Sequence, residues 1–174
     1  MNGSVHIFTF KRGLLSRVAH DLRLSVGRYQ ISVDGDAVTA SFEARSLQVD
    51  GVMKKGKLDP HALSAKDLRE VLTNTHGHVL LSDRHPQLRF AGRAQRSGDI
   101  LRVSGDLDMV GRRAAVAFPL RIIGQRAAGQ VELRPTRWGI APFKTLMGAI
   151  ALEDRVVVAF DVVMPEGMVG PRAR

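Results

Sequence analysis

The chain has 174 residues, of which 44% are hydrophobic and 25% charged, as expected of one soluble globular domain. It contains no cysteine, so disulfides, thiolate metal sites and thiol catalysis are excluded. The 26 Lys and Arg residues outnumber the 17 Asp and Glu residues, and the formal net charge of +9 favours anionic partners such as nucleic acid, phosphates or lipid head groups without choosing among them.

The N-terminal residues do not resemble a secretory signal. They show no basic segment followed by an apolar run and a small-residue cleavage site, so we expect a cytoplasmic protein. The longest apolar runs, such as 156–160, are too short to span a bilayer as a helix. We expect a single domain over 1–164, followed by a disordered tail over 165–174 that is rich in Gly, Pro and Arg.

Alternating apolar and polar residues predict strands in the first third of the chain. Three strands are expected, over 4–11, 22–33 and 38–45, together with a short helix over 14–21. Gly27 interrupts the second strand and predicts a bulge that bends it. The dipeptide Asp34-Gly35 predicts a tight hairpin turn before the third strand.

A second helix is predicted over 64–75. Ser64 and Asp67 resemble a capping box, and an apolar stripe follows at Leu68, Val71 and Leu72. We expect this helix to pack on the strands or to plug one end of the fold that they form.

The clearest strand pattern covers 101–122, which predicts two strands joined by a tight turn at Gly111. Further strands are expected over 88–94, 129–134 and 152–164, whereas 135–148 breaks the alternation and holds the single Trp. Eight strands result, mostly connected as hairpins, with two short helical segments. This pattern predicts a mainly all-β chain that closes into an eight-stranded antiparallel β-barrel, whose interior is either filled by side chains or holds one small ligand.

Two motifs within these strands resemble those of a known family. They are H-P-Q-L-R-F at 85–90 and G-D-L-D-M-V-G-R-R-A-A-V at 105–116, and looser matches extend the resemblance over 4–164. In this order and spacing the chain resembles the YceI-like family of lipocalin-like, isoprenoid-binding proteins. The resemblance implies an extended eight-stranded barrel that holds a polyprenyl chain or an isoprenoid quinone, commonly in the bacterial periplasm. The chain departs from the family at 64–69, where S-A-K-D-L-R has no histidine.

The first functional hypothesis is a non-enzymatic binding protein whose apolar lumen holds an isoprenoid lipid, a quinone tail or another long-chain lipid. The predicted lumen lining is Phe42, Phe90, Val103, Leu107, Val116, Phe118, Val158 and Phe160. The predicted lid or mouth residues are His20, Asp21, Trp138, Phe143, Leu146 and Met147. No catalytic residue, metal ligand or cofactor is expected, and a homodimer is left open.

Four alternative hypotheses are weighed against it. Ser16, His20 and Asp21 suggest a hydrolase triad, but Asp21 points elsewhere on a helix and no G-x-S-x-G elbow exists. The three histidines His76, His78 and His85 suggest zinc, although their spacing is loose. The charge suggests a nucleic-acid- or anion-binding barrel, but the phenylalanines fall on inward faces instead of forming a stacking surface. A barrel with a filled core that acts through its surface is the last alternative.

Overall fold

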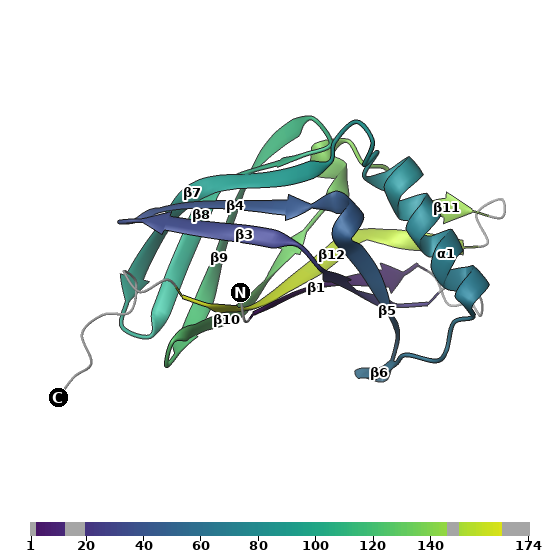
Figure 1. Cartoon of the computed structure of the whole chain (residues 1–174), viewed down its shortest axis with the longest axis horizontal. Coiled ribbons are helices and arrows are strands. Elements are labelled where there is room, and N and C mark those ends of the chain that lie inside the picture. The colour runs from purple at the N-terminus through teal and green to yellow at the C-terminus, as the bar shows by residue number, and fades with distance from the viewer. Residues whose placement is uncertain (1–2, 13–19, 146–149, 165–174) are drawn as a thin grey trace.

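Twelve strands, one α-helix and three short helical turns make up the computed structural model, which describes residues 3–12, 20–145 and 150–164 (Figure 1). The strands are β1 (Ser4–Lys11), β2 (Leu22–Val26), β3 (Tyr29–Asp34), β4 (Ala37–Glu43), β5 (Leu47–Lys54), β6 (Lys57–Asp59), β7 (Gln87–Ser97), β8 (Ile100–Met109), β9 (Arg112–Ile123), β10 (Arg126–Leu133), β11 (Lys144–Thr145) and β12 (Ile150–Val163). The helical elements are η1 (Ala44–Ser46), α1 (Ala65–Asn74), η2 (Thr75–Val79) and η3 (Pro135–Trp138).

The strands form one antiparallel sheet in the order β3-β4-β7-β8-β9-β10-β12-β1-β2-β5-β6, and β11 pairs with β12. The strands near the two ends of this order, β3–β4 and β2–β5, belong to one long bent hairpin. Backbone bonds from Gly27 N–H to Ser46 O and from Glu43 N–H to Arg28 O, both 3.0 Å, join its halves. Because this hairpin pairs with β7 on one side and with β1 on the other, the sheet closes into a barrel.

The predicted all-β class is confirmed, but the structure has more strands than the eight expected. One expected strand is divided, because the bulge predicted at Gly27 is a complete break between β2 and β3. The reason is pairing, since β2 pairs with β1 and β5, whereas β3 pairs with β4. The third expected strand corresponds to β4 and η1, and β5, β6 and β11 are additional.

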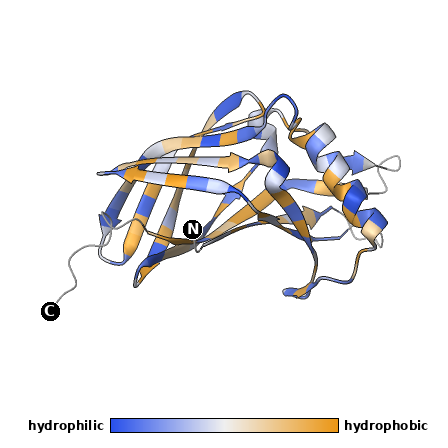
Figure 2. Cartoon of the chain, viewed as in Figure 1, coloured by the Kyte–Doolittle hydropathy of each residue, from blue (hydrophilic) through white to orange (hydrophobic). Residues whose placement is uncertain are grey.

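The strand pattern predicted over 101–122 corresponds to β8 and β9. Their turn residues Val110 and Gly111 have φ angles of 52° and 72°, as in the tight hairpin turns that match strand twist. Apolar side chains of this hairpin, among them Leu101, Val103 and Val116, are buried inside the barrel. Hydrophobic and hydrophilic bands therefore alternate along the strands (Figure 2).

Two glycines allow β7 and β8 to approach each other closely. Gly92 and Gly105 lie opposite one another in the ladder. A Cβ atom on Gly105 would lie 2.3 Å from Ala91 O and 2.4 Å from the Gly92 Cα atom, so no side chain fits there.

The predicted capping box begins α1. The Ser64 hydroxyl accepts a bond from the Asp67 backbone N–H at 3.2 Å, and the Asp67 carboxylate accepts one from the Ser64 N–H at 3.0 Å. The helix lies across one end of the barrel and has no fully buried residue (Figure 1). No helix in the described part of the chain is long and apolar enough to cross a bilayer. The helix predicted over 14–21 falls largely on residues 13–19, and the predicted tail on 165–174, both outside the described residues.

Candidate functional site: an apolar cavity inside the barrel

A cavity of about 680 Å³ lies inside the barrel. Its wall contains side chains from β1 to β5, β7 to β10 and β12, with α1 at one end. Nearly all of the lining side chains on the strands are apolar. This volume lies within the range of about 300–1,000 Å³ in which proteins hold organic molecules. The interior is therefore not filled by side chains.

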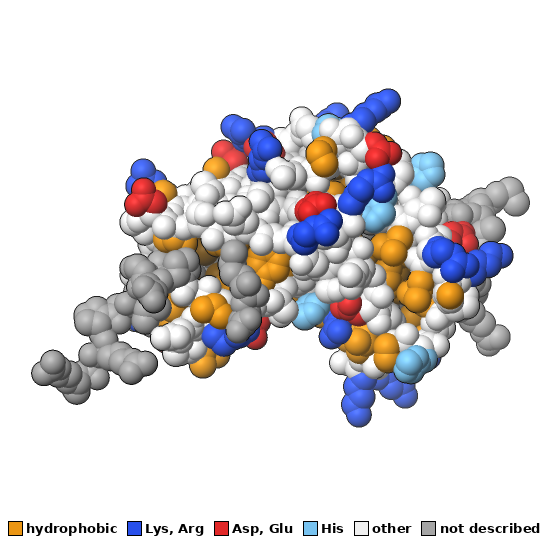
Figure 3. All heavy atoms as spheres, viewed as in Figure 1, with side chains coloured by type: hydrophobic (Ala, Val, Ile, Leu, Met, Phe, Trp, Pro, Cys, Tyr) orange, Lys and Arg blue, Asp and Glu red, His pale blue; other side chains and the backbone are white. Residues whose placement is uncertain are grey.

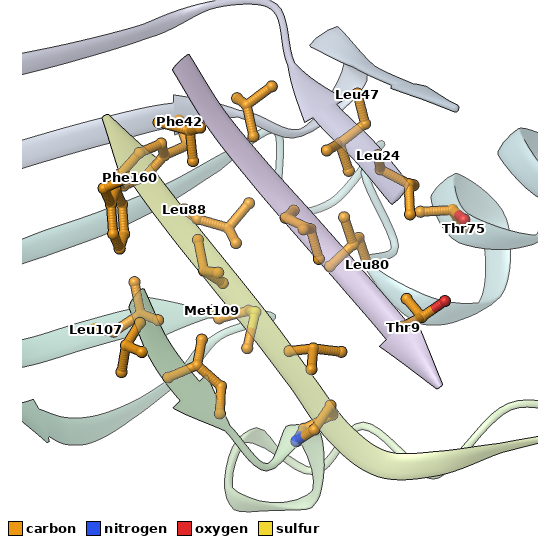
Figure 4. A pocket seen from close by; sticks show the side chains of 18 of the residues that line it. Thr9, Leu24, Phe42, Leu47, Thr75, Leu80, Leu88, Leu107, Met109 and Phe160 are labelled. Carbon is orange, nitrogen blue, oxygen red and sulfur yellow. The ribbon is translucent and has the colours of Figure 1, made fainter. Parts of the chain in front are cut away.

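All eight side chains predicted to face the lumen lie on the cavity wall, namely Phe42, Phe90, Val103, Leu107, Val116, Phe118, Val158 and Phe160. Strand alternation alone locates them, because each occupies an inward position of β4, β7, β8, β9 or β12. Phe42 and Phe160 lie at one side of the cavity, and Leu24 and Thr75 at the other (Figure 4).

An aromatic pair forms part of this wall. The rings of Phe118 and Phe160 stack with their centroids 5.4 Å apart and their planes 7° from parallel. Gly129 on β10 is the register partner of Phe160 on one side and of Leu120 on the other. With no side chain at Gly129, the Phe160 ring is free to reach across β10 to Phe118. A Cβ there would also lie 2.9 Å from Leu120 Cδ2.

Polar side chains gather at the end of the cavity near α1. They are Thr9, His20, Asp67, Glu70, Asn74 and Thr75. Asp67, Glu70 and Ala141 line the cavity and are also exposed, so the cavity reaches the surface at this end. At the opposite end Val163 is the exposed lining residue among those described.

The Thr9 hydroxyl is a buried polar group within this region. Its oxygen has no hydrogen-bond partner among the described residues. Figure 4 shows it on the side of the cavity nearest the helix, whereas the Thr75 hydroxyl there donates to Val71 O at 2.8 Å. A buried hydroxyl without a partner is uncommon, because leaving it unsatisfied costs free energy.

Three charged groups of the cavity wall are held by neighbouring side chains. Hydrogen bonds from Ser64 lower the pKa of Asp67, and hydrogen bonding from Arg28 lowers the pKa of Glu43, so both remain carboxylates at neutral pH. Arg155 contributes to the wall, but its guanidinium donates to Glu132 at 2.9 Å and lies 4.1 Å from the centre of the Phe10 ring.

The residues predicted for the lid or mouth lie in different parts of the structure. His20 and Phe143 line the cavity. Asp21 lies at the end of β1, where its Oδ1 accepts the Lys11 backbone N–H at 2.8 Å. Leu146 and Met147 lie outside the described residues.

Trp138 is buried behind the wall, and it does not stand at the mouth. It is 1% exposed and is not among the lining residues. Its indole N–H donates to Leu107 O at 2.7 Å, and Arg137 lies 5.5 Å from the ring centre. Trp138 therefore fixes η3 against β8, and the prediction of a lid role does not fit this position.

The sequence analysis does not identify the polar residues at the α1 end of the cavity. Thr9, Asp67, Glu70 and Asn74 were not predicted, although Thr9 follows Val5 and Ile7 on the inward face of β1. Both faces of β1 carry apolar residues, so alternation alone does not identify its inward face.

Within the described residues, the other catalytic and metal sites considered from the sequence are not assembled. Ser16 lies outside the described residues, and Asp21 is engaged by Lys11. The His76 ring lies 3.1 Å from the Ser82 hydroxyl, and burial, followed by Arg45, lowers the pKa of His76. Among the residues that the structure describes, no group of three His, Asp or Glu side chains is arranged to hold a metal ion.

Comparison with solved structures shows the same fold in other proteins. BcnA of Burkholderia cenocepacia superposes with a TM-score of 0.64 at 14% identity, covering 94% of this chain and 96% of that one. A polyisoprenoid-binding domain from Saccharophagus degradans gives 0.59 at 11% identity, with 94% of each chain covered. The YceI protein of Campylobacter jejuni gives 0.55 at 8% identity, covering 82% and 85%.

At these identities the structural matches establish the fold alone. No curated protein matches the chain in sequence. The YceI-like domain profile, however, matches residues 6–164, which extend from the third residue of β1 to the residue after β12. The chain therefore belongs to the YceI-like domain family.

Proposed function

We propose that this protein is a non-enzymatic carrier that holds an isoprenoid lipid, or the tail of an isoprenoid quinone, in the barrel cavity. The observation that carries the proposal is the continuous apolar wall around about 680 Å³ of space. The same space argues against a barrel with a filled core. One neighbour in the fold is itself described as a polyisoprenoid-binding domain, which supports the same ligand class.

Burial of hydrocarbon supplies enough free energy for such binding. Each methylene transferred from water contributes about 0.8 kcal/mol, so a chain of about ten buried carbons gains roughly 8 kcal/mol before the cost of ordering it. The wall needs no directed polar contact along the tail.

The polar end of the cavity favours an uncharged head group. The carboxylates of Asp67 and Glu70 would repel a phosphate there, whereas the unpartnered Thr9 hydroxyl can donate to a quinone or alcohol oxygen. A quinone or prenol is therefore expected to bind in preference to a prenyl phosphate.

Native mass spectrometry after gentle purification, followed by lipid extraction, tests the proposal. We expect a co-purifying polyprenoid, and a protein that neither co-purifies with one nor takes one up when it is added would overturn the proposal. The variant Thr9→Val tests the contact with the ligand's head group separately from the binding of its tail. Loss of one hydrogen bond should weaken quinone binding about two- to tenfold while leaving a prenyl hydrocarbon unaffected.

Nucleic acid is the weaker candidate. Stacking of bases requires exposed aromatic side chains, but Phe42, Phe90, Phe118 and Phe160 all face the cavity.

A further inference from the structure

All six lysines of the chain lie at the end of the barrel that carries α1. Lys11 ends β1, Lys54, Lys55 and Lys57 surround the β5–β6 turn, Lys66 begins α1, and Lys144 begins β11. Figure 1 places the end of β1, β6, α1 and β11 together. Arg12 directly follows β1, and Arg69 lies on α1. We call these eight exposed side chains the lysine face.

Most cations of the lysine face form no ion pair with any described residue. Within the described residues, Lys54 alone among the eight forms one, with Asp59 at 2.7 Å. Elsewhere in the described part of the chain seven arginines form ion pairs, as Arg93 does with Asp36 and Arg113 with Asp108, whereas Arg102 and Arg121 form none. The lysine face is therefore set apart by its grouping, because it brings all six lysines and two arginines to one end of the molecule.

Carboxylates that face this end do not cancel the charge. Asp21 accepts the Lys11 backbone N–H, Asp59 is paired with Lys54, and Asp67 caps its own helix. Glu70 and Glu153 line the cavity, and Glu153 lies 3.7 Å from Arg155. These carboxylates are fewer than the eight cations, and they lie toward the cavity or within local hydrogen bonds and ion pairs.

Apolar side chains accompany the cations. Leu68 and Leu72 lie one turn apart on α1 and are half-buried, but neither packs against the two buried clusters of the described residues. Leu58 on β6 is also half-buried. Hydrophobic side chains are visible beside basic ones over α1 and β6 (Figure 3).

We propose that the lysine face docks on an anionic lipid bilayer, with Leu68 and Leu72 against its surface. Basic residues beside partly exposed apolar ones fit the interface of a membrane that carries negative head groups. The cavity reaches the surface at this same end, so docking brings its opening to the bilayer. In this position lipid can pass directly between the bilayer and the cavity. This exchange rests on the proposed function, whereas the docking itself does not.

Two matched charge reversals test the docking. Lys57→Glu/Lys66→Glu changes the lysine face, and Glu in the first turn of α1 suits the helix dipole, so the fold is retained. Arg102→Glu/Arg121→Glu makes the same charge change on β8 and β9, at two exposed residues without an ion pair to any described carboxylate. Binding is measured by co-sedimentation with vesicles of phosphatidylcholine, with and without phosphatidylglycerol.

We expect the unchanged protein to bind vesicles only when phosphatidylglycerol is present, and less at high salt. Each basic residue near an anionic surface contributes about fivefold in affinity, so the lysine-face variant should bind about 30-fold more weakly. The barrel-wall variant should change binding less than about threefold.

Equal loss in both variants, or equal binding to uncharged vesicles, would overturn the proposal. So would absence of vesicle binding together with tight binding of a single-stranded oligonucleotide that Lys57→Glu/Lys66→Glu abolishes. The lipid content of each preparation is measured separately. A retained polyprenoid without vesicle binding rejects docking alone, whereas vesicle binding by a protein that takes up no polyprenoid rejects the carrier function alone.

Discussion

Blocking the lumen at one position of β12 should weaken lipid binding strongly, while the same change one residue away should not. Val158 lies on the cavity wall, with Ile7 and Val131 as its register partners. Val157 has the opposite orientation, with Phe8 and Glu132 as its register partners. Val158→Trp therefore places an indole in the cavity, and Val157→Trp places it on the outer surface.

The expected loss follows from the hydrocarbon that the indole displaces. Trp has seven more heavy atoms than Val. If they displace roughly three methylenes of the ligand, binding loses about 2.4 kcal/mol, or roughly 50-fold in affinity. Isothermal titration with a short-chain isoprenoid quinone measures this, with Val157→Trp as the matched control. If Val158→Trp and Val157→Trp bind the quinone with the same affinity, a ligand site inside the barrel is refuted.

Three further changes test the fold. Gly105→Ala should lower the free energy of unfolding by about 1–3 kcal/mol, because the new Cβ meets Ala91 O at 2.3 Å. Lys55→Asn should raise it by about 1 kcal/mol, because Lys55 has a φ angle of 50°. Ser64→Ala should destabilise at neutral pH and progressively less in acid. Ser64 lowers the pKa of Asp67, and the stability that results is lost as pH falls through that lowered value.

Chemical denaturation measures all three changes, each beside a control. Gly77→Ala adds a Cβ with nothing within 4 Å and should be neutral. Lys57→Asn changes an exposed residue two positions from Lys55, and Thr73→Ala changes an exposed residue at the other end of α1 from the capping box. The close approach of β7 and β8 is wrong if Gly105→Ala is tolerated. The strain argument fails if Lys55→Asn matches Lys57→Asn, and the capping argument fails if Ser64→Ala and the parent protein share one pH profile.

Local patterns predicted the parts of the fold that short-range physics determines. The β8–β9 hairpin followed from alternation and Gly111, and α1 followed from Ser64 and Asp67. Alternation also placed all eight predicted side chains on the cavity wall, since an inward position on a barrel strand is a position on the lumen.

Long-range contacts determined what sequence could not reveal. The break at Gly27 arises because β2 and β3 pair with different strands, and alternation does not show partners. Trp138 could be read as a lid because its bonding partner, Leu107 O, lies 31 residues away. The volume of the cavity depends on the distance between opposite walls of the barrel. The residue pattern of a single strand does not predict this distance.

The pairing of β1 with β12 has a consequence for how the chain folds. This ladder joins Ser4 to Asp161 and Thr9 to Val156, so the barrel closes only when its first and last long strands meet. One edge of β1 pairs with the nearby β2, but during synthesis its other edge must wait for β12, with the backbone groups on that edge unpaired. Such distant pairing is slow to form and leaves a strand edge open to other chains. Recovery of the folded protein should therefore depend strongly on chaperones and on expression temperature.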